Sequence, residues 1–302
     1  MMTFPNVTVI GLGLIGSSLA RAVQLHIPGV RVTGYDADAR VREIATRIKL
    51  CDHITESASA AVIDAALIVL CVPVGAMGAV AAEIAGDIPG DAILSDVGSC
   101  KESVIEAVRA SLPNVVFVPA HPVAGTEESG PEAGFASLFH HRWCIVTPPE
   151  GTDVRAVERV LEFWRSLGAE VETMRPDHHD RVLAVTSHLP HLIAYTIVGT
   201  ASDMEEVTQS EVIKYSAGGF RDFTRIAASD PTMWRDVFLA NRGAVLDMLQ
   251  RFSEDLTALQ RAIRWGKGDE LFELFTRTRS VRRSIIDKGQ DDARPDFGRS
   301  HE

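Results

Sequence analysis

Apolar and polar residues alternate along the first 174 residues in a way that predicts strands and helices in turn. Short runs rich in β-branched residues are followed by longer segments whose apolar residues recur every three or four positions. The strand-like runs cover residues 7–10, 30–35, 66–72, 92–96, 115–119, 143–147 and 170–174. The helix-like segments cover residues 14–25, 75–85, 101–111 and 153–167. This order is typical of an α/β fold with an open, doubly wound parallel sheet and helices on both faces.

The pattern changes after residue 174, where long helical segments follow one another without a convincing strand. Asp230-Pro231 has the form of an N-cap followed by proline at the first helical position. We expect one helix from there to about Ile263 and another over residues 269–288. The chain is therefore predicted to have an α/β domain at 1–174, an all-α domain at 175–288 and a disordered polar tail at 289–302. All-helical second domains often serve dimerisation.

The composition limits which binding partners and which cellular compartment are expected for this protein. The formal net charge of −11 argues against nucleic acid and against an anionic membrane surface. No apolar run reaches the roughly 20 residues that span a bilayer, and the N-terminus has neither the basic nor the apolar part of a signal peptide. We therefore expect a cytoplasmic protein. The four cysteines form no C-x-x-C pair, and buried free thiols are expected for Cys71 and Cys144.

A glycine-rich turn between the first strand-like run and the first helix-like segment carries the strongest chemical signal. Its sequence, Gly11-Leu12-Gly13-Leu14-Ile15-Gly16, is the dinucleotide-binding pattern G-x-G-x-x-G. Gly11 would make the tight turn, Gly13 would let the backbone approach a pyrophosphate, and Gly16 would let the helix pack closely on the strand. The helix N-terminus would offer N–H groups and a positive dipole to the phosphates.

An acidic residue stands where it would recognise the ribose of NAD. The second strand-like run ends at Tyr35, and Asp36 follows about 20 residues beyond the glycines. Its carboxylate would accept hydrogen bonds from both ribose hydroxyls and repel a 2′-phosphate, and no arginine follows until Arg40. The pattern predicts an NAD-binding Rossmann domain that prefers NAD to NADP. A glycine-rich turn that binds nothing is the alternative.

Two further segments leave strands at the edge of the sheet where ligands bind in such folds. His121 precedes a proline, so it is expected to continue its strand and to present its imidazole at the strand's end. Imidazole suits general acid–base work near neutral pH, although a histidine that is merely hydrogen-bonded there is the alternative. Ser99 fits a capping box with Glu102 that would start the next helix, and its hydroxyl can also face a nicotinamide.

The helical half holds a stripe of polar residues at helical spacing, formed by His188, His191 and Tyr195. They are either core or interface groups or polar groups that face the substrate. Two imidazoles could supply half a metal shell, but no nearby Cys, Asp or Glu completes it, so no metal is expected.

Two arginines, Arg221 and Arg225, lie four residues apart farther along the helical half. Like charges at that spacing are unfavourable unless an anion intervenes. Asp222 can partner Arg225, so a solvated helix face is one interpretation. A guanidinium fork for a carboxylate is the other.

In chain order these segments resemble the prephenate/arogenate (cyclohexadienyl) dehydrogenase family of tyrosine biosynthesis. The segment 11–16 occurs in many dehydrogenases, whereas the segments 187–191, 218–227 and 229–234 are specific in combination. The resemblance implies NAD-dependent oxidative decarboxylation of prephenate to 4-hydroxyphenylpyruvate, of arogenate to tyrosine, or of both. It also implies a homodimer with an α-helical C-terminal domain. The matches lie within roughly residues 6–285, at 11–16, 96–101, 121–127, 187–191, 218–227 and 229–234.

The resemblance implies a role for each matching side chain. His121 matches the catalytic histidine that hydrogen-bonds the ring hydroxyl, and Ser99 matches a serine between nicotinamide and substrate. Arg225 matches the arginine that binds the substrate carboxylate. The remaining matches are pocket groups, namely His188, His191, the acid Glu127, and Trp234, which in such enzymes can reach the partner subunit's site.

Two other functions are compatible with the same fold. One is another NAD-linked dehydrogenase of the β-hydroxyacid type. Such enzymes use a catalytic lysine in the helical domain, where this chain offers Lys214, Lys267 and Lys288. The other is a non-catalytic NAD-responsive binding protein, which would need neither His121 nor Arg225.

Overall fold

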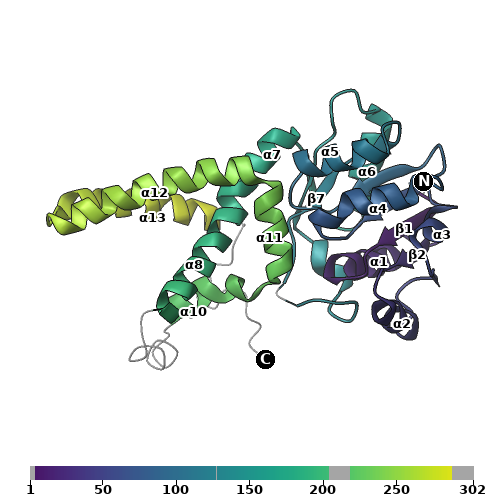
Figure 1. Ribbon diagram of the computed structural model, residues 1–302, viewed down its shortest axis with the longest axis horizontal. Helices are drawn as coiled ribbons and strands as arrows, with labels where there is room; N and C mark the ends of the chain where they lie inside the picture. Colours follow the sequence, from purple (N-terminus) through teal and green to yellow (C-terminus); the bar gives the residue numbers. More distant parts are fainter. Residues whose placement is uncertain (1–3, 127, 204–217, 288–302) are drawn as a thin grey trace. The chain divides into compact units, whose positions relative to one another are not determined.

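The computed structural model describes residues 4–126, 128–203 and 218–287 (Figure 1). Glu127 and the predicted disordered tail at 289–302 lie outside these residues. The chain divides into two compact units. The first comprises residues 1–190 and 228–245, and the second comprises residues 191–227 and 246–302.

The main sheet of the first unit has six parallel strands in the order β3-β2-β1-β4-β5-β6, the order of the Rossmann fold. The strands are β1 (Asn6–Ile10), β2 (Arg31–Tyr35), β3 (His53–Ile54), β4 (Leu67–Leu70), β5 (Ile93–Asp96) and β6 (Val116–Phe117). They are linked by α1 (Leu14–His26), α2 (Ala39–Arg47), α3 (Ala58–Val62), η1 (Val74–Ala76), α4 (Met77–Ile84) and α5 (Glu102–Ser111) (Figure 1). The predicted doubly wound sheet is confirmed for this part of the chain.

The register of the sheet places two predicted loops on one edge. Ile10, Leu70 and Asp96, which end β1, β4 and β5, lie side by side across the sheet. Neighbouring strands are about 4.8 Å apart, so the turn after β1 and the loop after β5 leave the sheet about 10 Å from each other.

The prediction of one parallel sheet is wrong for the last three strands of the α/β half. β7 (Ala120–Pro122), β8 (Trp143–Val146) and β9 (Glu170–Thr173) form a second sheet, in which β7 is antiparallel to β8 and β8 is parallel to β9. Pro119 has no N–H to continue β6, while its carbonyl accepts a hydrogen bond from Thr147 N (2.9 Å). The chain therefore leaves the main sheet before His121, which lies within β7.

A hydrophobic core of the first unit packs the strands of the main sheet together with α1, α6 (Val154–Ser166) and η2 (Ala136–Phe139). Helix α6 contributes Phe163 and Trp164, and η2 contributes Phe139. The Phe139 and Trp164 rings meet edge to face with their centroids 5.3 Å apart. The strands contribute smaller apolar residues, among them Val7, Val9, Leu67, Val69 and Ile93.

Every described element after β9 is helical, as predicted. These elements are α7 (Pro176–Leu183), the π-helix η3 (Ala184–His188), α8 (Leu189–Asp203), α10 (Gly218–Thr224), η4 (Arg225–Ala228), α11 (Pro231–Ala240), α12 (Arg242–Arg264) and α13 (Gly268–Asp287). The N-cap prediction is confirmed, because Met233 N donates to Asp230 Oδ1 at 2.8 Å. The single helix expected as far as Ile263 is wrong, since it is interrupted at Asn241. The side chain of Asn241 is buried, and its Nδ2 donates a hydrogen bond to the Asp180 backbone carbonyl at 2.8 Å.

One helical stretch is longer and more apolar than the sequence predicted. Pro176–Asp203 is long and apolar enough, by length and composition, to cross a membrane. A core helix of a soluble protein meets the same criteria. Leu183, Ala184 and His188, all in the first unit, are buried in the protein interior.

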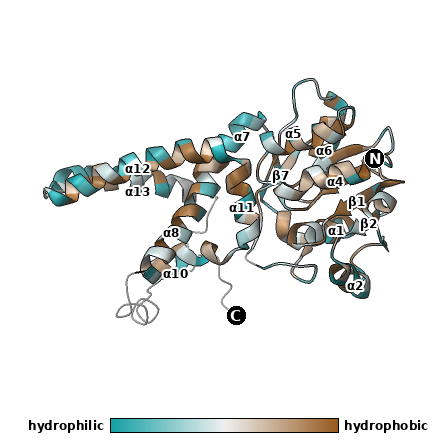
Figure 2. Ribbon diagram, viewed as in Figure 1, coloured by the Kyte–Doolittle hydropathy of each residue, from teal (hydrophilic) through white to brown (hydrophobic). Residues whose placement is uncertain are grey.

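Helices α12 and α13 carry apolar side chains that the chain itself leaves exposed. Figure 2 shows hydrophobic positions among hydrophilic ones along both helices. Trp265, in the turn between the two helices, is 65% exposed and Phe272 is 72% exposed. Exposed large apolar side chains that gather into a patch mark interaction sites. Among the described side chains of α12 and α13, the other exposed large apolar residues are Leu246, Leu256, Ile263, Phe275 and Val281.

Candidate active site

The glycine-rich turn is built so that a side chain would be excluded at two of its glycines. Gly11 has φ +96°, and a Cβ there would lie 2.6 Å from the Cys71 carbonyl oxygen. A Cβ at Gly16 would overlap the Gly11 carbonyl oxygen, so helix α1 approaches the turn more closely than alanine would allow. At Gly13 an added Cβ would meet no described atom within 4 Å. The turn therefore packs against the sheet on one side and is open at Gly13.

Asp36 lies against this turn. Leu12 N donates to Asp36 Oδ2 at 2.7 Å, and Asp38 N donates to Asp36 Oδ1 at 2.9 Å. The neighbouring Arg42 donates to the carbonyls of Asp36 (2.8 Å) and Ala37 (3.1 Å) and forms an ion pair with Glu56 (3.1 Å). The Arg42 guanidinium is therefore bound to two backbone carbonyls and to Glu56, and not to the Asp36 carboxylate.

These residues fit a dinucleotide. The N-cap of α1, Gly13, has an extended backbone, and no described side chain caps the helix, so its first N–H groups are available to phosphate oxygens. The carboxylate of Asp36 stands at the end of β2, where an acidic group recognises ribose hydroxyls in Rossmann folds. Gly11 to Gly16, with Leu12, Leu14 and Ile15 between them, and Asp36 would hold NAD.

A buried ion pair lies at the carboxyl end of β5. Lys101 Nζ is 2.6 Å from Asp96 Oδ2, and both side chains are fully buried. Gly98 N also donates to Asp96 Oδ2 at 2.8 Å. Burial raises the pKa of Asp96, and the Lys101 ammonium and the hydrogen bonds oppose that shift.

The same ion pair fixes the backbone that precedes His121. Lys101 Nζ donates to the Ala120 carbonyl at 2.7 Å, and Ala120 N donates to Asp96 Oδ1 at 3.3 Å. Both polar groups of Ala120 are therefore bound to β5 and its loop. This places His121 beside the same sheet edge as the glycine-rich turn, although His121 belongs to the second sheet.

His121 is buried, at 8% exposure, in contact with a second histidine. Its Nδ1 lies 2.8 Å from His179 Nε2, and the two rings meet edge to face with their centroids 5.1 Å apart. Burial is the largest cause that lowers the pKa of His121 well below 6.5, and His179, Lys101 and His188 lower it further. The His121 imidazole is therefore neutral at pH 7.

Ser99 does not cap the following helix, so the capping-box prediction is wrong. Helix α5 begins at Glu102 with Lys101 as its N-cap residue. The cap is supplied from helix α7, because Asp180 Oδ1 accepts from Lys101 N (2.8 Å) and Asp180 Oδ2 accepts from Glu102 N (3.0 Å). Ser99 is half-buried in the loop between Asp96 and Lys101.

Two predicted pocket residues lie in the first unit with His121. His188 is fully buried at the end of the π-helix η3, where its Nδ1 lies 3.1 Å from Asn241 Nδ2. Trp234 of α11 is buried, and its ring is edge to face with His188 at a centroid distance of 6.1 Å. His188 acts on the pKa of His121, so the two imidazoles belong to one electrostatic environment.

Two other predicted substrate-binding residues belong to the second unit. His191 is half-buried in α8 and Arg225 is exposed at the start of η4, both in the second unit. Glu127 lies outside the described residues.

Five polar residues of this site were not singled out from the sequence. They are Asp96, Lys101, His179, Asp180 and Asn241. Asp96 and Lys101 flank the loop that contains Ser99. Their separation by five residues, from the end of a strand to the start of a helix, was the signal from which an ion pair could have been predicted. His179 and Asp180 sit in a polar run, Asp177-His-His-Asp-Arg181, that resembles a solvated helix N-terminus.

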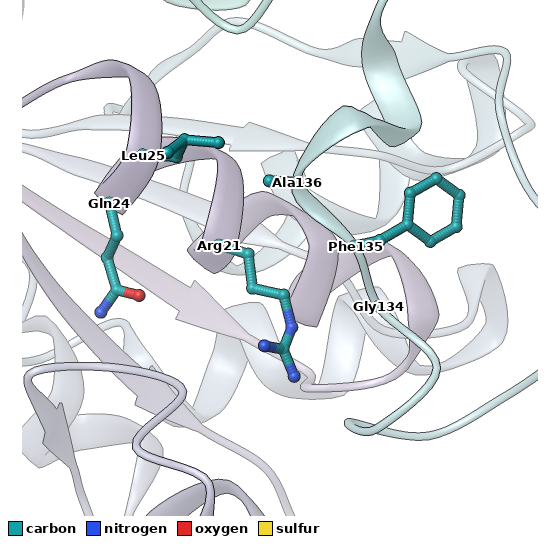
Figure 3. Close-up of a pocket in the computed structure, with 6 residues that line it drawn as sticks. All are labelled: Arg21, Gln24, Leu25, Gly134, Phe135 and Ala136. Carbon is teal, nitrogen blue, oxygen red and sulfur yellow. The ribbon is translucent and has the colours of Figure 1, made fainter.

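A separate hollow of about 540 Å³ lies away from these residues. Figure 3 shows Arg21, Gln24 and Leu25 of α1 opposite Gly134, Phe135 and Ala136. None of the candidate catalytic residues lines it. We assign the chemistry to the His121 site because buried titratable groups converge there.

A Rossmann sheet with a glycine-rich turn that fits a dinucleotide, and a buried neutral imidazole at the same sheet edge, is the arrangement of an NAD-dependent dehydrogenase, which is the class that fold and site define. Comparison with known families agrees. The prephenate dehydrogenase nucleotide-binding domain matches residues 19–173, and the prephenate dehydrogenase dimerization domain matches residues 175–277. The chain belongs to the prephenate dehydrogenase family, and the resemblance drawn from the motifs is confirmed.

Individual relatives extend the match over nearly the whole chain. A cyclohexadienyl dehydrogenase of Zymomonas mobilis is 44% identical over 295 residues, which are 98% of this chain and 100% of that protein. The crystal structure of prephenate dehydrogenase from Aquifex aeolicus with hydroxyphenyl propionate and NAD+ aligns with a TM-score of 0.87 at 33% identity, covering 93% of this chain and 98% of that one. Synechocystis arogenate dehydrogenase aligns with a TM-score of 0.78 at 26% identity, covering 93% and 99%.

The β-hydroxyacid alternative finds no support in the described residues. Of its three candidate lysines, Lys214 and Lys288 lie outside them. Lys267 is exposed and forms a surface ion pair with Glu270 at 2.6 Å.

Proposed function

We propose that this protein oxidises prephenate, arogenate or both with NAD, and that CO₂ is released in the same reaction. The observation that carries the proposal is the buried, neutral His121 at the sheet edge that also carries the glycine-rich turn. The names of the relatives support both substrates, since one is a prephenate dehydrogenase and another an arogenate dehydrogenase.

The proposed chemistry needs a base, an anion-binding group and alignment. The substrate ring carries a hydroxyl at C4 and a carboxylate at C1. NAD, when bound, supplies the oxidant that takes the hydride from C4. His121 Nε2 accepts the proton of the C4 hydroxyl as the O–H bond breaks, and the C4 oxygen becomes a carbonyl oxygen. The bond between C1 and the carboxylate then breaks and CO₂ leaves. The electrons of that bond complete the aromatic ring, and the C4 oxygen takes back a proton from the His121 imidazolium to become the phenol hydroxyl.

His121 can serve as this base because its surroundings keep it unprotonated. Aromatisation supplies the driving force, so the protein's contribution is alignment and proton removal. In this proposal Arg225 binds a substrate carboxylate and Ser99 lies between nicotinamide and substrate. The remaining pocket groups are His188, His191, Glu127 and Trp234.

The assembly and compartment of this enzyme are also proposed. Residues 1–174 would bind NAD, and residues 175–288 would bind substrate and form a homodimer through the apolar side chains of α12 and α13 (Figure 2). The match to a dimerization domain supports this assignment. Its four cysteines are all free thiols, as in proteins of a reducing compartment, so a cytoplasmic enzyme is proposed.

The test is formation of NADH with prephenate and with arogenate in parallel, repeated with NADP. Turnover of either substrate supports the proposal, and the ratio of kcat/KM values names the preferred one. A protein that binds NAD but turns over neither substrate refutes it. Sedimentation at several concentrations tests the homodimer.

A further inference from the structure

Three side chains form a hydrogen-bonded chain that ends at the proposed base. Asp180 Oδ1 lies 2.8 Å from His179 Nδ1, and His179 Nε2 lies 2.8 Å from His121 Nδ1. All three residues are buried, with His179 fully and Asp180 almost fully inaccessible. No step of the reaction proposed above uses His179 or Asp180.

The position of each proton in this chain follows from the partners. The Asp180 carboxylate already accepts backbone hydrogen bonds from Lys101 and Glu102, so His179 Nδ1 must donate to it. Burial lowers the pKa of His179, against the opposing effect of Asp180, so this imidazole is neutral at pH 7. Its Nε2 then carries no proton and accepts a hydrogen bond from His121 Nδ1. The proton of neutral His121 is thus on Nδ1, and its Nε2 is the acceptor.

We propose that His179, oriented by Asp180, is a positioning residue that holds His121 in the one tautomer whose Nε2 can take the proton of the substrate hydroxyl. The inference rests on the proposed role of His121 as the base. Without this partner, His121 can hold its proton on either nitrogen, and the Nε2–H form would present a donor where an acceptor is needed.

The same chain keeps a hydrogen-bond acceptor, His179 Nε2, beside His121 Nδ1 after His121 has taken the proton. Among the described residues, Lys101 and Asp96 also carry charge close to this chain, and their opposite charges are paired with each other at 2.6 Å. Asp180 is therefore the anion connected to His121 by hydrogen bonds, through His179. The Nδ1–H of the His121 imidazolium donates to a ring that the carboxylate makes a stronger acceptor.

Two substitutions at residue 179 test the two hydrogen bonds of His179 separately. In His179→Gln the side-chain oxygen reaches the position of Nε2 and can still accept from His121 Nδ1. In His179→Asn the shorter amide can still donate to Asp180 but leaves His121 Nδ1 without its acceptor. His178 is the neighbouring exposed residue on the same helix, so His178→Gln and His178→Asn are matched controls.

The first measurement needs no turnover. Nitrogen NMR of the full-length protein with ¹⁵N-labelled histidine reports which ring nitrogen carries the proton, and His121→Asn assigns the signal. We expect the His121 proton to be on Nδ1 in the wild type and in His179→Gln. In His179→Asn we expect a mixture of the Nδ1–H and Nε2–H forms of His121. An Nε2–H His121 in the wild type overturns the proposal, even if His179→Asn fails to fold.

The second measurement is steady-state kinetics. We expect His179→Asn to lower kcat by about 10- to 100-fold, part of the roughly 10²- to 10⁴-fold that a positioned base contributes. KM should stay unchanged, and His179→Gln should retain most of the wild-type kcat. A wild-type kcat in His179→Asn, or equal losses in both folded variants, refutes the positioning role. If the wild type turns over neither substrate, the proposed function fails, and the NMR result alone decides this inference.

Discussion

Lys101→Met should destabilise this protein far more than the loss of an ordinary ion pair. The substitution removes the ammonium from a fully buried pair and leaves the Asp96 carboxylate with only backbone N–H partners. It also removes the donor to the Ala120 carbonyl. Breaking a buried pair by deleting one partner costs about 3–5 kcal/mol, because the remaining charge is buried without compensation. We expect a fall of that size in the free energy of unfolding.

The chain offers a matched control for this prediction. Lys267 and Glu270 form an ion pair with the same N–O distance of 2.6 Å, but their side chains are 46% and 60% exposed. Lys267→Met should cost at most about 1 kcal/mol, as exposed pairs do. The double variant Asp96→Asn/Lys101→Met should recover part of the stability, because no charge is then left buried.

The effect of Lys101→Met should also depend on pH with a definite sign. Burial already raises the pKa of Asp96, and removing the ammonium raises it further. A raised pKa in the folded state means that stability is lost as pH rises through that pKa. The deficit of Lys101→Met should therefore shrink as pH is lowered from about 8 to about 5.

The assay is guanidinium unfolding at fixed protein concentration, followed by circular dichroism and by tryptophan fluorescence. A deficit for Lys101→Met no larger than that for Lys267→Met would refute the argument that burial sets the cost. A deficit that does not change with pH would show that the stranded carboxylate is not its cause.

Four further predictions concern the site. His121→Asn should lower kcat by about 10²- to 10⁴-fold with little change in NAD affinity measured by calorimetry, and an unchanged kcat would exclude His121 as the base. Asp36→Ser should raise kcat/KM for NADP relative to NAD by about fivefold or more, since like charges about 4 Å apart repel by about 1 kcal/mol even in water; an unmoved ratio would mean that Asp36 does not contact the ribose. Arg225→Ala should raise the KM for substrate by about 10- to 100-fold, the loss of a charge-assisted hydrogen bond of about 1.5–3 kcal/mol, and a wild-type KM would move the carboxylate site elsewhere. Stability should fall as pH drops below about 6.5, by up to about 1.4 kcal/mol per pH unit for each of His121 and His179, because the unfolded chain takes up protons that the folded chain excludes; denaturant unfolding measures the slope, which His121→Asn should flatten.

Much of the fold was predictable because its signals are local. The glycine-rich turn, the strand before it and Asp36 after the next strand lie within one short stretch of chain. Backbone conformation limits which residues such a turn can contain, as the geometry at Gly11 and Gly16 shows. The helical second half was predictable for the same reason, since apolar spacing and the Asp230 cap act within single helices.

The strand pairing of β7 to β9 and the start of α5 were not predictable in this way. A strand pattern states that a segment is extended but not which neighbour it pairs with, so the antiparallel pair of β7 and β8 became evident only in the fold. Ser99 has the local sequence of an N-cap, yet the cap comes from Asp180, 79 residues away from Lys101. Local capping was overridden because a distant carboxylate is buried against the same N–H groups.

By itself, the sequence determined the dinucleotide turn, the α/β order, the helical second half and the family. Only the tertiary structure decided the surroundings of His121. His179 lies 58 residues from it and belongs to a polar run that resembles a solvated helix start. The pKa of an imidazole and the nitrogen that carries its proton depend on burial and on partners within about 3 Å. Those partners are set by how distant segments pack, and the spacing of residues along a chain does not encode them.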